Sequence, residues 1–332
     1  MRHSIKSTMF VGAFLFGLLM CFTSCEDILG HWEKPTPVTP TPTPTPEPEP
    51  EPTPTPGLLA GTFKINADGD QVQFSQGNLQ ATYDGTKWTW AFATNQWDYI
   101  GNDAGNTSVN GDGTVSAAGT VDLFGWVGES NTTWTGAAKY GISNSNTTGD
   151  ANTYGNVAAE ALRSDWGNTM DADWSNKTGA STSGWRTLTG GSGGEWEYLF
   201  NTRTTTSGIR YAKATVNGKV GVILLPDDWD VSYYALTSAN TPNAAYTTNA
   251  ITSDDWTNKL EAHGAVFLPA AGRRDDTTVS YVGTAGCYWS SSPYTTSVHL
   301  AYCVYFTGGS LKPADYINRF YGFSVRLVRD AE

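Results

Sequence analysis

The stretch "LKPADYINRFYGFSVRLVRD", residues 311–330, decides the fold because two kinds of pattern meet within it at Gly322. Over 323–328 the chain reads F-S-V-R-L-V, in which Phe, Val and Leu take alternate positions. A period of two with apolar residues on one side is the pattern of a half-buried strand. The preceding segment 316–321, Y-I-N-R-F-Y, fits neither a helix nor a strand. We therefore predict a strand over 323–328 and, before it, either unusual core residues or a contact surface.

The N-terminus has the three parts of an export signal. Arg2 and Lys6 precede an apolar run over residues 9–20, and small and polar residues follow. The run is too short to span a bilayer comfortably and has the length of the hydrophobic region of a signal peptide. We predict that residues 1–24 are a signal peptide.

Cysteines follow the apolar run at Cys21 and Cys25. Only Cys25 comes after a small residue, Ser24, and its surroundings resemble the bacterial lipobox, with Phe22 where Leu is usual. The resemblance implies that Cys25 is lipidated, so we expect an exported, lipid-anchored protein at the outer membrane or cell surface. An ordinary secretory signal with incidental cysteines is the alternative.

Proline alternates with Thr, Glu or Val over residues 34–57, "KPTPVTPTPTPTPEPEPEPTPTPG". Each residue before a proline is held in an extended conformation, and proline donates no backbone hydrogen bond, so neither helix nor sheet can form. A polyproline II segment of this length reaches roughly 70 Å. We predict a lipid anchor and stalk over 25–57 that carry one folded domain, residues 58–332.

The charge and composition of the chain exclude some partners. It has 20 Lys and Arg against 32 Asp and Glu, a formal net charge of −12. Such an acidic protein is a poor ligand for nucleic acid or for anionic lipid, so we expect membrane contact only through the lipid. Abundant aromatic residues (13%) and Gly (36), with few charged residues (16%), are typical of a β-rich exported domain.

The folded region is predicted to be α+β, with few helices and long Gly/Asn/Ser/Thr loops. A helix over 252–264 would have Thr252 or Ser253 as N-cap and Gly264 as C-cap, and a second helix is expected over 193–203. Predicted strands lie at 61–67, 72–82, 87–93, 219–226 and 264–272.

A set of motifs after Trp185 gives a more specific indication. In chain order they are "GWRTLTGGSGGEWEYLFNTR", "GVILLPDDWD", "GAVFLPAAGRRD", "GCYWSSSP" and "GFSVRLVRD". They resemble the Fibrobacter succinogenes major paralogous domain family, whose relatives include the formylglycine-generating enzymes and, through them, the C-type lectin fold. The resemblance covers residues 61–332. It implies a C-type-lectin-like domain in which the G-F-S-V-R-L-V strand pairs centrally and the segment before it shapes a surface.

Some related lectin-like proteins are targets of diversity-generating retroelements, which randomise adenines in a C-terminal gene segment. An Asn codon of the AAY type can then become any residue except Trp, Gln, Met, Glu or Lys. Residues 290–321 contain every type within reach and, of those out of reach, only Lys312. The resemblance therefore implies a ligand-contacting segment over 290–321, which is either diversified or a fixed loop of this lineage.

Periodicity indicates which side chains would make the contact. In "AYCVYFT", residues 301–307, Val304 and Phe306 are expected to face the core, which leaves the alternate residues outward. Tyr is a good outward anchor because it offers a large contact area with a hydrogen-bonding tip. Half-buried loop packing is the alternative. The predicted ligand-binding residues are Tyr294, His299, Cys303, Tyr305, Thr307, Asp315, Tyr316, Ile317, Asn318, Phe320 and Tyr321.

Catalysis finds less support. Formylglycine-generating enzymes use nearby cysteines with copper, whereas Cys287 and Cys303 are much further apart in sequence, so we expect a disulfide or free thiols there. The folded region holds only His263 and His299, which argues against a His-rich metal site. No protease, esterase or phosphate-binding motif is present. We predict a binding protein, not an enzyme, with the oxidase relationship as the least favoured alternative.

Two further expectations concern ions and assembly. The acidic clusters "PDDWD" (226–230) and "RRDD" (273–276) could bind calcium as C-type lectins do, although turns capped by Asp are the simpler interpretation. We predict no required cofactor or metal. A monomer with a protein or glycan ligand is favoured over an adhesin or fimbrial subunit, because neither end of the domain offers a free alternating strand for donation.

Overall fold

The computed structural model describes residues 56–85, 88–107, 118–126, 166, 183–275, 277–297 and 300–332. The chain divides into two compact units, Met1–Pro52 and Thr53–Glu332, and all described residues lie in the second. The predicted signal peptide, Cys25 and most of the predicted stalk lie outside the described residues. Within the described ranges, no helix has the length and apolar character needed to cross a membrane.

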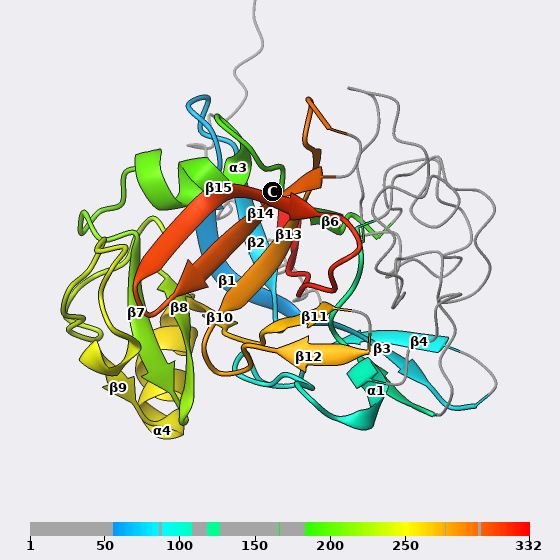
Figure 1. Ribbon diagram of the computed structural model, residues 1–332. Helices are drawn as coiled ribbons and strands as arrows, with labels where there is room; N and C mark the ends of the chain where they lie inside the picture. The colour runs from blue at the N-terminus through cyan, green and yellow to red at the C-terminus, as the bar shows by residue number, and fades with distance from the viewer. Residues whose placement is uncertain are drawn as a thin grey trace, which may run out of the picture. The chain divides into compact units, whose positions relative to one another are not determined.

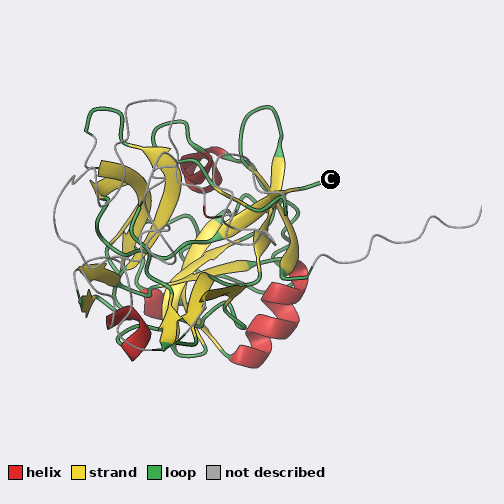
Figure 2. Ribbon diagram, turned by 90° about the vertical axis from the view of Figure 1, so that its right-hand side faces the viewer, coloured by secondary structure: helices red, strands yellow, loops and turns green. Residues whose placement is uncertain are grey.

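Short antiparallel strands in several small sheets make up most of the second unit, with a few helices at the outside of the strands (Figures 1 and 2). The strands are β1 Leu58–Lys64, β2 Gln71–Ser75, β3 Leu79–Tyr83, β4 Trp88–Phe92, β5 Gly119–Val121, β6 Arg186–Thr187, β7 Tyr211–Val216, β8 Lys219–Leu224, β9 Ala250–Ile251, β10 Val266–Pro269, β11 Arg273–Asp275, β12 Thr278–Ser280, β13 Gly286–Pro293, β14 Leu300–Thr307, β15 Ser310–Asn318 and β16 Leu327–Asp330. This is an α+β domain, as predicted.

Among the described residues, the strands form sheets of order β1-β2-β16-β6, β10-β8-β7-β9, β13-β14-β15, β4-β3-β5 and β11-β12. The helical elements are α1 Ala104–Thr107, α3 Glu195–Glu197 continued by η3 Tyr198–Thr202, η4 Tyr246–Thr248, and α4 Ser253–Asp255 continued by η5 Trp256–Leu260 and η6 Glu261–His263. β7 and β9 pair in parallel.

The helix predicted over 252–264 is confirmed together with its caps. The Thr252 hydroxyl accepts a hydrogen bond from the backbone N–H of Asp255 at 3.1 Å, which satisfies one of the free donors of the first turn. Gly264 ends the helix with φ +80°, a conformation that favours glycine. The second predicted helix corresponds to α3 and η3. Local capping chemistry was therefore enough to place the longer helix.

The strand predicted over 323–328 is only partly correct. β16 begins at Leu327 and pairs with both β2 and β6. Residues 322–324 instead make isolated bridges, such as the reciprocal backbone hydrogen bonds between Phe323 and Phe124 at 2.8 and 2.9 Å. All residues over 323–328 are buried, so the segment is enclosed on both sides and is not half-buried. The alternation correctly predicted that Phe323, Val325 and Leu327 are buried, but the prediction that the other side faces solvent was wrong.

The segment before Gly322 also differs from the prediction. It was expected to be irregular, yet β15 is a regular strand up to Asn318 and pairs with β14 along its length. A bulge shifts the register once between Lys312 and Asp315, so Tyr316 and Ile317 keep the plain alternation of a strand, and the irregular large residues are those after its end, Phe320 and Tyr321. Within residues 311–330, the part between the end of β15 and the start of β16 is residues 319–326.

Arg326 explains why both sides of the 323–328 segment are buried. Its side chain is fully buried, and one terminal nitrogen donates to Oε1 of Gln96 at 2.8 Å and to the carbonyl of Gln76 at 3.3 Å. The other terminal nitrogen reaches the carbonyl of Phe267 at 3.4 Å and Oδ1 of Asn78 at 3.5 Å. Burial lowers the pKa of Arg326 to about 10, so the guanidinium stays charged at neutral pH.

Buried apolar side chains form three clusters, and β14 contributes to two of them. Val304 and Phe306 belong to the first cluster, as predicted, together with side chains of β1, β2 and β10. Ala301 and Cys303, on the other side of the same strand, pack in the second cluster with Trp289. The sheet β13-β14-β15 is therefore covered on both faces over part of its area.

We predict that Arg326→Met destabilises the protein by more than about 2 kcal/mol, because it leaves buried carbonyl and amide oxygens without donors. The control Lys259→Met, which removes an exposed cation paired with Asp255 one helical turn away, should cost about 0.5 kcal/mol or less. Urea unfolding of the two variants measures the difference. An equal loss in both would contradict the assigned role of Arg326.

Candidate binding surface

The predicted contact residues lie mainly on the sheet β13-β14-β15, but on opposite faces of it. Tyr302 stands opposite Tyr316, and the next pair along is Cys303 with Asp315. Directly opposed residues of an antiparallel pair project to the same face, and successive residues project to opposite faces. The single predicted surface is therefore two surfaces, separated by the thickness of the sheet.

The first surface carries three tyrosines, Tyr294, Tyr302 and Tyr316, which we call the tyrosine cluster. The rings of Tyr294 and Tyr316 stack with centroids 4.1 Å apart, and the ring of Tyr302 meets Tyr294 edge-on at 5.2 Å. Tyr316 is 47% exposed, and the other two are half-buried. Two of these residues were predicted to contact ligand, and the structure brings them together.

A glycine-rich loop supports the tyrosine cluster from below. A Cβ added to Gly191, which has φ +91°, would lie 2.9 Å from the ring of Tyr302, so the ring packs directly on the backbone. The backbone N–H of Gly190 donates to the Ser292 hydroxyl at 3.1 Å, and the Ser290 hydroxyl donates to the carbonyl of Tyr302 at 2.8 Å. These bonds hold the loop that precedes α3 against β13 and β14.

Tyr302 was not among the predicted contact residues, because it lies on the same side of β14 as Val304 and Phe306, which face the core. The alternation was correct, but the core ends before it reaches Tyr302, where the loop of Gly190 and Gly191 takes over. A hydroxyl-bearing ring at the end of an apolar alternation was the one available signal.

The second surface holds predicted residues that pack more tightly than expected. Tyr305 and Ile317 are half-buried against the second apolar cluster. Cys303, predicted to point outward, is 2% exposed, and Phe320 is 7% exposed. The prediction of an outward Cys303 is wrong, because the neighbouring segment 319–326 folds over this face of β14 and fills it with aromatic rings such as Phe323.

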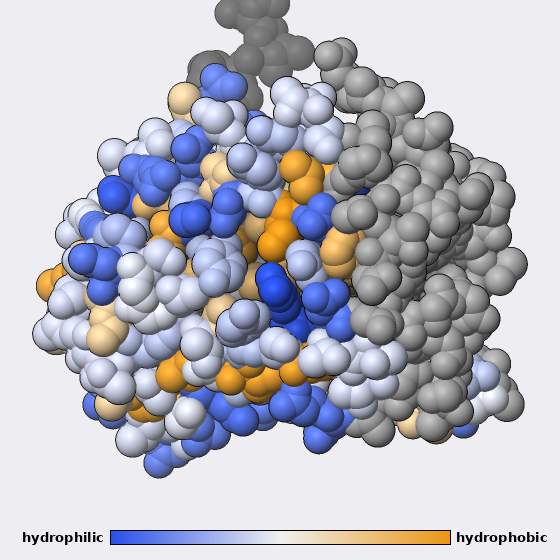
Figure 3. Space-filling view, viewed as in Figure 1, coloured by the Kyte–Doolittle hydropathy of each residue, from blue (hydrophilic) through white to orange (hydrophobic). Residues whose placement is uncertain are grey.

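Arg273 lies between aromatic rings beside this second surface. Its guanidinium is 4.4 Å from the ring centre of Tyr321 and 5.1 Å from that of Tyr281, which is 54% exposed. Such cation–π contacts contribute about 0.5–1 kcal/mol each at exposed sites. Figure 3 shows the side of the molecule on which β13, β14 and β15 lie in Figure 1, with hydrophobic residues among hydrophilic ones.

The remaining predicted residues are dispersed. Asp315 forms an ion pair with Lys312 at 3.7 Å, and the Thr307 hydroxyl shares a hydrogen bond of 3.1 Å with Ser310 in the turn between β14 and β15. Asn318 ends β15 and is half-buried. His299 lies outside the described residues.

Two aspartates of the acidic cluster 226–230 have structural roles. Asp227 accepts from Arg203 at 2.8 Å and from the backbone of Lys64 at 2.8 Å, so it is a structural carboxylate. Asp230 caps the backbone N–H of Ser232 at 2.8 Å, the turn interpretation made from the sequence. Within the described part of the chain, no three His, Cys, Asp or Glu side chains gather as metal ligands, and Asp276 lies outside it.

Part of the chain matches a family of proteins. A family model described as "Domain of unknown function (DUF8237)" matches residues 224–328, which include β13, β14 and β15. No curated protein and no solved structure matches the chain.

Cys287 and Cys303 are free thiols, each 2% exposed. Burial raises the pKa of Cys287 to about 12 and that of Cys303 well above its ordinary value, so neither is a thiolate near neutral pH. We predict that iodoacetamide at pH 8 leaves both unmodified in the folded chain and modifies both in urea. Mass spectrometry of the two peptides measures this, and equal labelling in the folded and unfolded chain would contradict it.

Proposed function

We propose that this chain is a lipid-anchored surface protein whose C-type-lectin-like domain binds a protein or glycan ligand through the tyrosine cluster. The observation that carries the proposal is the stacked pair of the exposed Tyr316 and the half-buried Tyr294, beside which the loop of Gly190 and Gly191 fixes Tyr302. Exposed aromatic side chains held in place from below are typical of binding hot spots.

The chemistry of the tyrosine cluster suits recognition more than catalysis. The hydrogen bond with Tyr294 raises the pKa of Tyr316, and its hydroxyl, neutral at physiological pH, keeps acceptor capacity for a ligand beside that bond. Tyrosine side chains give large contact areas with little loss of conformational entropy on binding. A ligand can therefore contact the rings and hydrogen-bond to the hydroxyls without further rearrangement of the sheet.

Several features support the lectin-like and anchored parts of the proposal. β16, which contains the end of the G-F-S-V-R-L-V motif, lies inside its sheet between β2 and β6, as the family resemblance implies. The export signal, Cys25 and the Pro/Thr/Glu stalk supply the anchor and the distance from a membrane. On this proposal the protein acts as a monomer at the outer membrane or cell surface.

If the segment 290–321 is diversified, the burial of its residues limits where change is tolerated. Val304 and Phe306 are fully buried in the main core, and replacing them would create cavities that cost about 2–5 kcal/mol each. Tyr316 is 47% exposed and Tyr294 is half-buried outside the apolar clusters, so replacing them opens no core cavity of this kind. We propose that any variation which alters binding is concentrated at these two positions.

We predict that the double variant Tyr294→Ala with Tyr316→Ala binds the ligand of the native full-length chain roughly 10- to 100-fold more weakly. This is the effect expected when an aromatic hot spot is removed. Binding is measured against a panel of immobilised glycans and purified surface proteins. The unfolding midpoint should stay close to that of the native chain because Tyr316 is exposed and the half-buried Tyr294 belongs to none of the apolar clusters.

The matched control is Tyr281→Asn, which removes an exposed tyrosine near the second surface and keeps a residue that tolerates φ +62°. It should leave affinity unchanged. Loss of binding in the control but not in the double variant would place the site on the second surface and overturn the proposal.

A further inference from the structure

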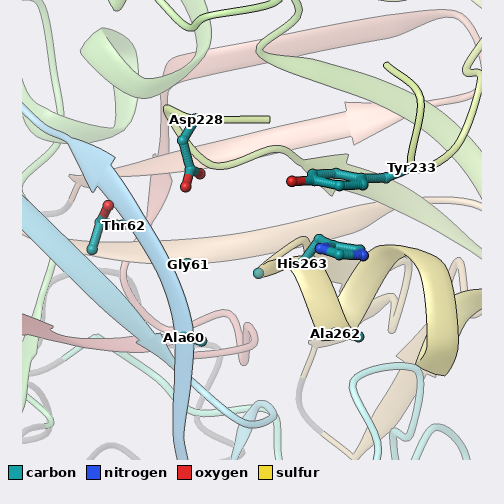
Figure 4. A pocket seen from close by; sticks show the side chains of 8 residues that line it. Ala60, Gly61, Thr62, Asp228, Tyr233, Ala262 and His263 are labelled. Atoms are coloured by element: carbon teal, nitrogen blue, oxygen red, sulfur yellow. The ribbon is translucent and has the colours of Figure 1, made fainter. Parts of the chain in front are cut away.

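A separate pocket lies on elements that contribute nothing to the tyrosine cluster. Its volume is about 220 Å³, and β1, the loop after β8 and the end of η6 form its walls (Figure 4). The lining residues are Ala60, Gly61, Thr62, Asp228, Tyr233, Ala262, His263 and Gly264. Nothing in the sequence pattern indicated it, because its residues are brought together from three distant segments.

Two glycines create the floor of the pocket. Gly61 of β1 and Gly264 after η6 approach so closely that a Cβ on either would collide with the backbone of the other. Gly264 also has the positive φ that ends the helix. The absence of side chains at these positions lets the two backbones meet, and this contact forms the floor of the pocket.

Two adjacent acids have opposite roles at the pocket wall. Asp227 is held by Arg203 at 2.8 Å and by Gln71 at 3.0 Å, as part of the fold. Asp228 is exposed, and within the described part of the chain its carboxylate takes part in no hydrogen bond or ion pair. Figure 4 shows the Asp228 carboxylate and the hydroxyl end of Tyr233 directed toward the same space.

Tyr233 is fixed in this position by its neighbours. Its ring stacks on His263 with centroids 3.6 Å apart and planes 2° from parallel, and the buried Trp229 packs edge-on at 5.5 Å. The backbone N–H of Tyr233 donates to the carbonyl of Asp230 at 3.1 Å, which closes the turn. With one ring face covered by His263, Tyr233 presents its hydroxyl end to the pocket and no open aromatic cage for a cation.

The groups around the pocket therefore combine one carboxylate with side chains that both donate and accept hydrogen bonds. Asp228 can accept from two neighbouring hydroxyls, while Tyr233, Thr62 and the His263 ring can donate or accept. A ligand that matches this set carries several adjacent hydroxyls and no negative charge, since the chain has a net charge of −12 and Asp228 would repel an anion. We propose that this pocket binds a neutral saccharide unit.

The test titrates the full-length chain with methyl glycosides of glucose, galactose, mannose and N-acetylglucosamine, with saturation-transfer NMR as the readout. At least one is expected to bind with a Kd below about 10 mM. Asp228→Asn should weaken that binding tenfold or more, because it removes the negative charge and replaces one acceptor oxygen with a donor. Tyr233→Phe should also weaken it, because it removes the hydroxyl and keeps the ring. Methyl glucuronide, an anion, should bind less well to the native chain than to Asp228→Asn.

Matched controls make the same chemical changes elsewhere. Asp254→Asn alters an exposed acid in the first turn of α4, and Tyr281→Phe alters an exposed tyrosine; neither should change glycoside binding. The variant Tyr294→Ala with Tyr316→Ala should also bind glycosides normally, so failure of this proposal and of the proposed function can be told apart. No binding of any glycoside near 10 mM, or an equal effect of Asp228→Asn and Asp254→Asn, would overturn the proposal.

Discussion

The buried guanidinium of Arg326 is the constraint on which the rest of the domain depends. It joins the C-terminal segment to the turn after β2, to the loop after β4 and to β10, and it does so with hydrogen bonds to backbone and amide oxygens. Among the described residues no carboxylate pairs with it. A buried cation without a counter-ion is costly unless its donors are used, so these segments must meet in one arrangement. β16 and the bridges of residues 322–324 follow from that arrangement.

The position of the segment 319–326 in turn determines what the sheet β13-β14-β15 can expose. Because this segment covers one face of β14, Cys303 becomes a core residue and Tyr305 is half-buried. The other face is covered by the main core at Val304 and Phe306 and becomes free only near Tyr302. The open aromatic surface is therefore at one end of the sheet, where the loop of Gly190 and Gly191 replaces the core as support.

Features with local causes were predictable from the sequence, and features with distant causes were not. The helix from Ser253 to His263 was predicted with its caps because Thr252 and Gly264 act within one turn. Alternation correctly divided the residues of β14 between two sides but could not show that both sides are covered. The pocket was not predicted because the approach of Gly61 to Gly264 joins residues far apart in the chain.

The change of support from one end of β14 and β15 to the other has a consequence for how such a protein can change. Val304, Phe306 and Leu311 hold the sheet on the core, whereas Tyr316, near the other end of β15, and Tyr294, just after β13, lie beyond that core. On the proposed function, the residues that specify the fold and the residues that would contact a partner therefore occupy different positions of the same sheet and its adjoining turn. A lineage could replace one set while inheriting the other intact, so new specificities would not require a new scaffold.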